Sequence, residues 1–288
     1  MIATTALSKR YGEHLALDEV ALHVPEGSVY GLAGRNGAGK TTLIGILAGL
    51  RRATSGTVTI DAPPERVAVL ADAPRFDPWL TGREVVALAQ RLTDPEGDID
   101  GVLDQAGLTD AKGRRVGGYS RGMLQRLGVA AAIVGRPRLL LLDEPASALD
   151  PQGRREVLDL IARLRGTATV LFSSHILGDV QEVCDTVGVL DHGRLLFQGP
   201  IDDLLVGAAG PRYVVRLRGP VDHVAHALRA HPWVTHVETG PEQLTVGVTA
   251  LEYAEAELPR ALAAADALVV SLGPEELTLE RAFLALTQ

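Results

Sequence analysis

The segment Gly34–Thr41 reads Gly-Arg-Asn-Gly-Ala-Gly-Lys-Thr and has the residue types that bind phosphate groups. Its glycines let the backbone turn tightly and point N–H groups at phosphate oxygens. Lys40 can reach the outer phosphates of a nucleoside triphosphate, and the Thr41 hydroxyl can ligate Mg²⁺. A chance match in a glycine-rich turn is the alternative. The strand expected before the loop and the helix expected after it favour nucleotide binding.

A second candidate site follows four consecutive leucines, Leu139–Leu142, where the chain reads Asp143-Glu144-Pro145. Carboxylates at the carboxyl end of a buried parallel strand lie where α/β sheets bind ligands. We expect Asp143 to face Mg²⁺, directly or through water, and Glu144 to act as general base toward an attacking water. A solvated strand end that stops at a proline is the alternative.

The elements that must position these residues follow from the spacing of apolar side chains. Strands are predicted over Ile2–Leu7, Val20–Val24, Ser28–Leu32, Thr57–Ile60, Leu139–Leu142 and Ala168–Phe172, with a hairpin over Val187–Leu190 and Leu195–Gln198. Helices are predicted over Thr41–Leu50, Thr81–Leu92, Ile99–Ala106, Ser120–Val134, Gln152–Leu164 and Leu177–Cys184. Apolar runs without alternation indicate a parallel sheet covered on both faces.

A Gly/Ala/Pro-rich stretch, Val206–Pro211, indicates a domain boundary. We expect one domain over residues 1–207, with a helical subdomain at about residues 73–137, and a second domain over residues 211–288. The second domain reads as strand Tyr213–Leu217, helix Val221–Ala230, strands Val234–Glu238 and Leu244–Val248, helix Tyr253–Ala264, strand Leu268–Ser271 and helix Glu276–Leu286. Its first six elements have the βαββαβ order of a ferredoxin-like fold.

Composition narrows the class of protein. The chain of 288 residues is 46% hydrophobic and 22% charged, which is ordinary for a globular protein. Its net charge of −8 disfavours a sequence-blind nucleic-acid binder. One cysteine, Cys184, cannot form an internal disulfide and fits a reducing compartment. We see no signal peptide and no apolar run of the roughly 18–20 residues that a membrane helix needs.

Together these features resemble the ATP-binding subunit of an ABC transporter, more closely the exporter type with a small C-terminal domain. The signature of that family resembles Tyr119–Met123, and its subunit-interface segment resembles Ser147–Asp150. His175 resembles its switch histidine, and Tyr11 resembles the aromatic residue that stacks on adenine. The closing helix of the exporter type resembles Leu277–Leu284. The resemblance covers nearly the whole chain.

The resemblance implies a P-loop α/β cassette with a mixed sheet and a helical subdomain, followed by the ferredoxin-like α+β domain. It implies that the catalytic residues are Glu144, His175 and Lys40, and that Mg²⁺ is held by Thr41, Asp72 and Asp143. Nucleotide-binding residues would be Tyr11, Gly34, Arg35, Asn36, Gly37, Ala38, Gly39, Lys40, Thr41, Thr42, Ser120 and Gly122.

Four positions depart from the family pattern. Asp72 stands at the glutamine position of the loop Leu70–Pro74, and its charge near the terminal phosphate would make hydrolysis slower or more dependent on Mg²⁺. In the signature, Arg121 replaces the first glycine and Tyr119 replaces the usual leucine. Arg35 in the phosphate loop either points to solvent or contacts a phosphate.

The resemblance also implies partners. With one phosphate loop and one signature per chain, two copies would meet head to tail over two ATP molecules. A separate integral-membrane permease would dock between the Asp72–Thr81 loop and the helical segment, and would hold the chain at the inner face of the membrane. No nucleic-acid partner is expected. A low-activity or regulatory ABC ATPase is one alternative, and a soluble ABC ATPase not linked to transport is another. The C-terminal domain would support dimerisation or regulation, or simply stabilise the chain.

Overall fold

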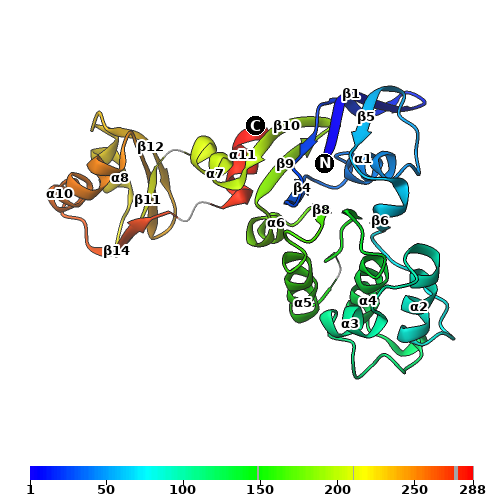
Figure 1. Ribbon diagram of the computed structural model, residues 1–288. Coiled ribbons are helices and arrows are strands. Elements are labelled where there is room, and N and C mark those ends of the chain that lie inside the picture. Colours follow the sequence, from blue (N-terminus) through cyan, green and yellow to red (C-terminus); the bar gives the residue numbers. More distant parts are fainter. Residues whose placement is uncertain (148, 210, 276–277, 288) are drawn as a thin grey trace. The chain divides into compact units, whose positions relative to one another are not determined.

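A computed structural model describes residues 1–147, 149–209, 211–275 and 278–287 (Figure 1). The chain divides into two compact units, Met1–Ile201 and Asp202–Gln288. This division comes before the Gly/Ala/Pro-rich stretch at which composition indicated a boundary. Four residues named in the expectations above lie outside the described residues: Ala148, Gly210, Glu276 and Leu277.

The centre of the first unit is a six-stranded sheet with the order β10-β9-β4-β8-β7-β6. Its strands are β4 (Val29–Ala33), β6 (Val67–Leu70), β7 (Leu139–Leu142), β8 (Thr169–Ser174), β9 (Thr186–Asp191) and β10 (Arg194–Pro200). All neighbours pair in parallel except β10, which returns antiparallel to β9 in the predicted hairpin. Every residue of β4, β7 and β8 is buried, as a sheet covered on both faces requires.

A second, antiparallel sheet contains the N-terminal strands of this unit. It consists of β1 (Ile2–Tyr11), β2 (His14–Val20), β3 (His23–Val24) and β5 (Ser55–Ile60), with β1 paired to the other three. Helix α1 (Lys40–Leu47) follows β4 and contributes Leu43, Ile44 and Leu47 to the core shared with β1 and β2. Residues 14–19, which the sequence did not predict as a strand, belong to β2, and the strand expected over Val20–Val24 is divided between the end of β2 and β3.

Three helices form a group within residues 73–137: α2 (Gly82–Thr93), α3 (Ile99–Gln105) and α4 (Arg121–Ile133). Each begins at a side chain that accepts a hydrogen bond from the first turn, and the three caps are Thr81, Asp98 and Ser120. Thr81 and Glu84 complete a reciprocal capping box. Two short 3₁₀ turns lie at Pro64–Arg66 and Val116–Gly118.

The two remaining helices of the unit follow the buried strands β7 and β8. Helix α5 (Pro151–Ala162) comes after β7 and is capped by Asp150, while α6 (Leu177–Val183) comes after β8. Arg154 of α5 and Asp179 of α6 form an ion pair whose carboxylate is only 3% exposed. Burial raises the pKa of Asp179, and the Arg154 guanidinium opposes that shift. This pair joins the two helices that continue from neighbouring strands.

The second unit has an antiparallel sheet with the order β12-β13-β11-β14. Its elements are α7 (Ile201–Ala209), β11 (Arg212–Leu217), α8 (Asp222–Arg229), β12 (Val234–Thr239), β13 (Gln243–Val248), α9 (Leu251–Ala256), α10 (Leu258–Ala264), β14 (Val269–Pro274) and α11 (Leu279–Thr287). Leu228, Leu244, Val246 and Leu258 are among its fully buried side chains. The order of strands and helices is that expected from the sequence, apart from α7 and the division of one helix.

Three features of the fold were not anticipated. Strand β6 is only four residues long and was not predicted, and neither was α7. The helix expected over Tyr253–Ala264 is divided into α9 and α10, because Pro259 lacks the N–H and its ring clashes with a continuing helix. No helix of the described residues has the length and apolar character needed to cross a bilayer.

Candidate functional site

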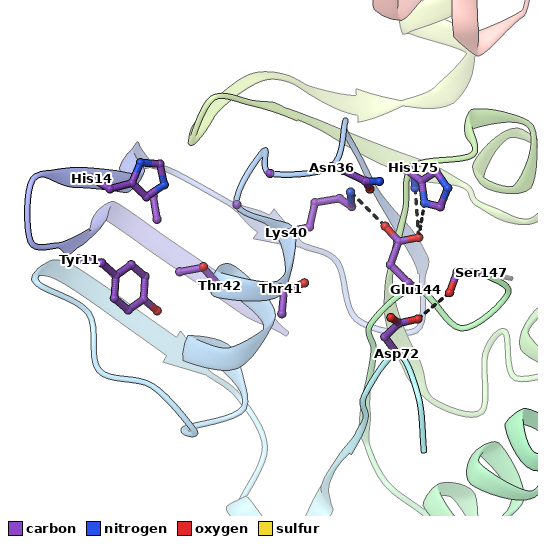
Figure 2. Close-up of a pocket in the computed structure, with 13 residues that line it drawn as sticks. Tyr11, His14, Asn36, Lys40, Thr41, Thr42, Asp72, Glu144, Ser147 and His175 are labelled. Atoms are coloured by element: carbon purple, nitrogen blue, oxygen red, sulfur yellow. Dashed lines mark hydrogen bonds and ion pairs between the residues drawn. The ribbon is translucent and has the colours of Figure 1, made fainter. Parts of the chain in front are cut away.

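The parallel sheet brings four chemically active segments to one edge. Strands β4, β8, β7 and β6 lie next to one another in that order, and their carboxyl ends all face the same way. The phosphate loop follows β4, and His175 follows β8. Glu144 follows β7, and Asp72 follows β6. Residues separated by more than a hundred positions in the chain are therefore neighbours (Figure 2).

The phosphate loop has the backbone conformation that its glycines permit. Gly37 and Gly39 have φ angles of 85° and 109°, in the left-handed region. A Cβ at Gly39 would lie 2.6 Å from the Ala16 carbonyl oxygen, so only glycine fits there. No described side chain caps the N-terminus of α1, and its first turn carries no acidic residue. The N–H groups of that turn can therefore serve an anion.

Lys40 is held at the centre of the site. Its side chain is only 5% exposed, and its ammonium lies 3.1 Å from Oε1 of Glu144. The ammonium also donates to the carbonyl oxygens of Gly34 at 2.8 Å and Arg35 at 3.2 Å. A buried ammonium needs such partners, because burying an unpaired charge is costly. Lys40 is thus fixed within the loop with its charge directed at the cavity.

Glu144 has the most unusual backbone of the site residues, with φ of 49°. A non-glycine residue in this region costs of order 1–3 kcal/mol and persists where the surroundings hold it. Its side chain is 13% exposed and accepts from Lys40 and from Nδ1 of His175, which lies 2.7 Å from Oε2. The strained conformation aims the carboxylate into the cavity between these two groups (Figure 2).

A buried hydroxyl links the Asp143 carboxylate to the backbone N–H of Glu144. Ser173 of β8 is fully buried, and its Oγ donates to Oδ1 of Asp143 at 2.7 Å. The same oxygen accepts from the backbone N–H of Glu144 at 2.9 Å. The backbone N–H of Asp143 in turn donates to the Leu70 carbonyl of β6. The network fixes the end of β7 against both neighbouring strands, and no pattern in the sequence indicated the role of Ser173.

Asp72 also lines the cavity and is hydrogen-bonded to the segment after Glu144 (Figure 2). Its Oδ1 accepts from the Ser147 hydroxyl at 2.6 Å. This hydrogen bond connects the loop after β6 to the segment that resembles the family's subunit interface. One carboxylate oxygen is used by Ser147, which leaves Oδ2 for another ligand.

These groups surround a cavity of about 610 Å³, a volume suited to a small ligand. Eleven of the thirteen residues that line it come from the sequence expectations or their segments, and all thirteen are Tyr11, His14, Ala16, Asn36, Gly37, Gly39, Lys40, Thr41, Thr42, Asp72, Glu144, Ser147 and His175. His14 and Ala16 were missed, because they lie on the unpredicted part of β2. His14 pairs with Tyr11 in the β1–β2 register.

Several expected site residues do not line this cavity. Among the described residues, its walls do not include Gly34, Arg35, Ala38, Ser120, Gly122 or Asp143. Gly34 and Ala38 are buried within the loop, and Arg35 is exposed. Ser120 caps α4 in the helical group by accepting from the Met123 N–H. Within the described residues, the segment that resembles the family signature therefore does not line this cavity.

The cavity offers few protein oxygen ligands for Mg²⁺. No group of three or more His, Cys, Asp or Glu side chains in the described residues is arranged to hold a metal ion by itself. Mg²⁺ in nucleotide sites is usually held by one or two protein ligands together with phosphate oxygens and water. Thr41 and Asp72 line the cavity, and Asp143 stands behind Glu144. This sparse oxygen set fits the ion only alongside a phosphate ligand.

Comparison with known proteins gives consistent matches. The profile of the family described as "ABC transporter" matches residues 17–147. The bacitracin transport ATP-binding protein BcrA of Bacillus licheniformis is 38% identical over an alignment of 217 positions, which covers 71% of this chain and 71% of BcrA. The daunorubicin resistance ATP-binding protein DrrA3 of Streptomyces coeruleorubidus is 34% identical over an alignment of 303 positions, which covers 99% of this chain and 95% of DrrA3.

Among solved structures, one described as "Structure of ATP binding subunit of ABC transporter" superposes with a TM-score of 0.63. It is 26% identical and covers 71% of this chain and 91% of its own. This structural match agrees with the family profile, because both are described as belonging to ABC transporters.

Proposed function

The chain belongs to the ATP-binding subunits of ABC transporters, and from that premise we propose that it powers export through a separate integral-membrane permease. The observation that carries this proposal is the convergence of Lys40, Glu144 and His175 at the phosphate loop. Relatives named for bacitracin transport and daunorubicin resistance support an export role. The proposed location is the inner face of the cell membrane, through the permease.

In this proposal the phosphate loop and Lys40 bind the triphosphate of ATP. Lys40 exchanges its bond to Glu144 for phosphate oxygens, because its ammonium is within reach of both. The uncapped N-terminus of α1 adds N–H groups to the same anion. When bound, Mg²⁺ neutralises phosphate charge, and Thr41, Asp72 and Asp143 are the residues that would hold it.

Glu144 is the proposed general base. Release from Lys40 leaves its carboxylate hydrogen-bonded to His175, in a position to accept a proton from an attacking water. The left-handed backbone at Glu144 holds the carboxylate toward the cavity rather than along the strand. His175 would orient Glu144 with Nδ1 and use its other ring nitrogen toward the terminal phosphate.

We propose that the active unit contains two copies of the chain. The N-terminus of α4, with Ser120 and Gly122, lies outside the cavity that contains Lys40. A second copy placed head to tail would bring its own Ser120 to the terminal phosphate and complete the site. ATP binding would favour the closed pair, and hydrolysis would favour its opening.

The proposed docking site for the permease is a pocket beside the loop after β6. It has a volume of about 300 Å³. It is lined by Val69, Leu70, Ala71, Pro74, Arg75, Phe76, Gly128, Ala131 and Ala132. Trp79, on the same loop, is 71% exposed. A pocket lined mainly by apolar and small residues, beside a loop that also carries an exposed aromatic side chain, suits a short helix of a membrane partner.

The experiment that tests the proposal is ATP turnover by the purified chain, alone and with the membrane protein that copurifies with it. We expect Mg²⁺-dependent release of phosphate and formation of a dimer with ATP. A chain that binds ATP without turnover would instead be the low-activity or regulatory subunit suggested by Asp72. A chain that copurifies with RNA or ribosomes rather than with a membrane protein would contradict the transport role.

Asp72 itself is proposed to belong to the Mg²⁺ shell through the oxygen that Ser147 does not use. Asp72→Ala should then raise the Mg²⁺ concentration needed for half-maximal turnover, while Ser147→Ala, which keeps the carboxylate, should change it less. An unchanged Mg²⁺ dependence in Asp72→Ala contradicts this assignment.

A further inference from the structure

Tyr11 presents an aromatic ring to the cavity from the end of β1. It is 42% exposed and lines the same cavity as Lys40 and Thr42. A ring this exposed has rotational freedom, which a base stacking on it would have to remove. Whatever holds the ring in place before binding therefore strengthens the binding of the base. Two basic side chains near Tyr11 meet that description.

The first of these is Arg51, which comes shortly after α1. Its Nη1 donates to the Tyr11 hydroxyl at 2.8 Å. The Arg51 side chain crosses the face of Gly45 in α1, where a Cβ would lie 2.9 Å from the Arg51 Cδ. The backbone N–H of Arg51 also donates to the Gly45 carbonyl at 2.9 Å. The missing side chain at Gly45 is thus what allows the guanidinium to reach Tyr11.

The second basic side chain is Lys9, which precedes Tyr11 by two positions in β1. Its ammonium lies 4.8 Å from the centroid of the Tyr11 ring, within the range of a cation–π contact. The same ammonium donates to the Arg52 carbonyl at 2.7 Å, so it is anchored. Lys9 is not among the described residues that line the cavity. It therefore covers one face of the ring and leaves the other for a ligand.

The pKa of the Tyr11 hydroxyl agrees with this geometry. The hydrogen bond from Arg51 lowers the pKa of Tyr11, with smaller contributions from Thr42 and the Lys9 charge. Thr42 belongs to the first turns of α1, so the Tyr11 hydroxyl lies between the phosphate-binding helix and the segment after it.

We propose that Arg51 is a positioning residue, which fixes the Tyr11 ring as a platform for the base of the bound nucleotide, with Lys9 covering the opposite face. The inference rests on the proposed nucleotide-binding function and deepens it. Arg51 does not contact the phosphates in this assignment. Its contribution depends on the base being present, and this dependence separates it from a general effect of positive charge.

The test compares the affinities of ATP and of inorganic triphosphate, both with Mg²⁺, in the full chain. Arg51→Met keeps most of the aliphatic stem and removes the guanidinium. We expect the Kd for ATP to rise about two- to tenfold, the range for ordering one side chain on binding, and the Kd for triphosphate to stay the same. Arg52→Met is the matched control, because it removes the same charge one residue away and should change neither value.

A second variant does not depend on the behaviour of Arg51→Met. Tyr11→Phe keeps the ring and removes the hydroxyl that Arg51 holds, so it should raise the Kd for ATP by a similar factor. Arg51→Met should then have no further effect in the Tyr11→Phe background. A merely structural role of Arg51 would instead lower the thermal midpoint and add to the effect of Tyr11→Phe.

The outcomes separate the two levels of inference. Equal weakening of ATP and triphosphate by Arg51→Met, or unchanged ATP affinity in both variants, would overturn the positioning role while the nucleotide-binding function stands. A wild-type chain that binds triphosphate no better than it binds sulfate, and that does not bind ATP, would overturn the proposed function itself.

Discussion

The six-stranded sheet of the first unit and the antiparallel sheet of the second unit distribute their charged residues in opposite ways. In the six-stranded parallel sheet, the ends of β4, β8, β7 and β6 bring Lys40, His175, Glu144 and Asp72 to one edge. In the antiparallel sheet of the second unit, consecutive strand ends alternate between two edges. The topology of the sheet, rather than the number of charges, therefore decides where reactive side chains come together.

Burial reinforces this contrast. Lys40 and Glu144 are 5% and 13% exposed and pair at 3.1 Å. In the second unit, Glu238 is 59% exposed and pairs with Arg212 at 3.3 Å and with His236 at 3.6 Å. Ion pairs that exposed contribute little to stability, whereas a buried pair at a cavity has a strong field to offer a ligand. One cluster is therefore suited to chemistry and the other to the surface of a folded unit.

The sharpest test of the comparison makes one chemical change in both places. Glu144→Gln should reduce ATP turnover by about 10²–10⁴-fold, the range for loss of a general base, while ATP still binds. Glu238→Gln should leave turnover unchanged. Phosphate release and nucleotide binding measure the two effects. Near-normal turnover in Glu144→Gln would remove Glu144 from the role of base.

A second test concerns the buried hydroxyl behind the site. Ser173→Ala leaves the Asp143 carboxylate without its donor and the Glu144 N–H without its acceptor. We expect a loss of about 1–3 kcal/mol in the free energy of unfolding, together with lower turnover, because Glu144 is less firmly held. Urea unfolding measures the first quantity. Ser271→Ala on the exposed strand β14 is the control, and an equally small effect of both changes would argue against the network.

The packing of the two sheets can be compared through their glycines. A Cβ at Gly31 of β4 would lie 2.7 Å from the Cys184 sulfur and would also collide with Val180, and both of these side chains are buried. A Cβ at Gly247 of β13 would collide with the ring of His236, which is 35% exposed and can move aside.

We therefore expect Gly31→Ala to reduce the free energy of unfolding by about 1–3 kcal/mol and Gly247→Ala to reduce it less. Denaturant titration of both variants beside the wild type measures the difference. A larger loss in Gly247→Ala would show that the second unit is the more tightly packed of the two.

The smallest expected effect is a pH dependence confined to the first unit. Burial raises the pKa of the Cys184 thiol well above its usual value. The unfolded chain releases this proton from about pH 8.5 upward while the folded chain retains it. The free energy of unfolding should therefore be constant with respect to this group below that pH and fall by at most about 1.4 kcal/mol per pH unit above it.

The reaction of Cys184 with a thiol reagent across a denaturant series, measured between pH 8 and pH 10, reports the decline in the free energy of unfolding. Cys184→Ala, followed by fluorescence, should have a shallower slope over the same range. Burial also raises the pKa of Tyr30, so part of the decline above pH 10 should remain in the variant. An identical slope in both proteins would contradict the assignment to Cys184.

The local parts of the site could be predicted from the sequence because they are made of consecutive residues. Gly34–Thr41 determines its own turn through its glycines, and the leucine run before Asp143 identifies a buried strand by itself. The caps Thr81, Ser120 and Asp150 likewise act within one turn of their helices. Such signals involve only neighbours in the chain, so no knowledge of the fold is needed to recognise them.

The contacts between distant segments could not be read from the sequence, because the tertiary structure alone determines them. The order of β4, β8, β7 and β6 places Glu144 between Lys40 and His175, and the left-handed backbone at Glu144 fixes its direction. Ser173 behind Asp143, Ser147 on Asp72 and Arg51 on Tyr11 carry no sequence signal of their own. A serine or an arginine can bond to many partners, and the packing of the sheet and helices alone determines which partner comes within hydrogen-bonding distance.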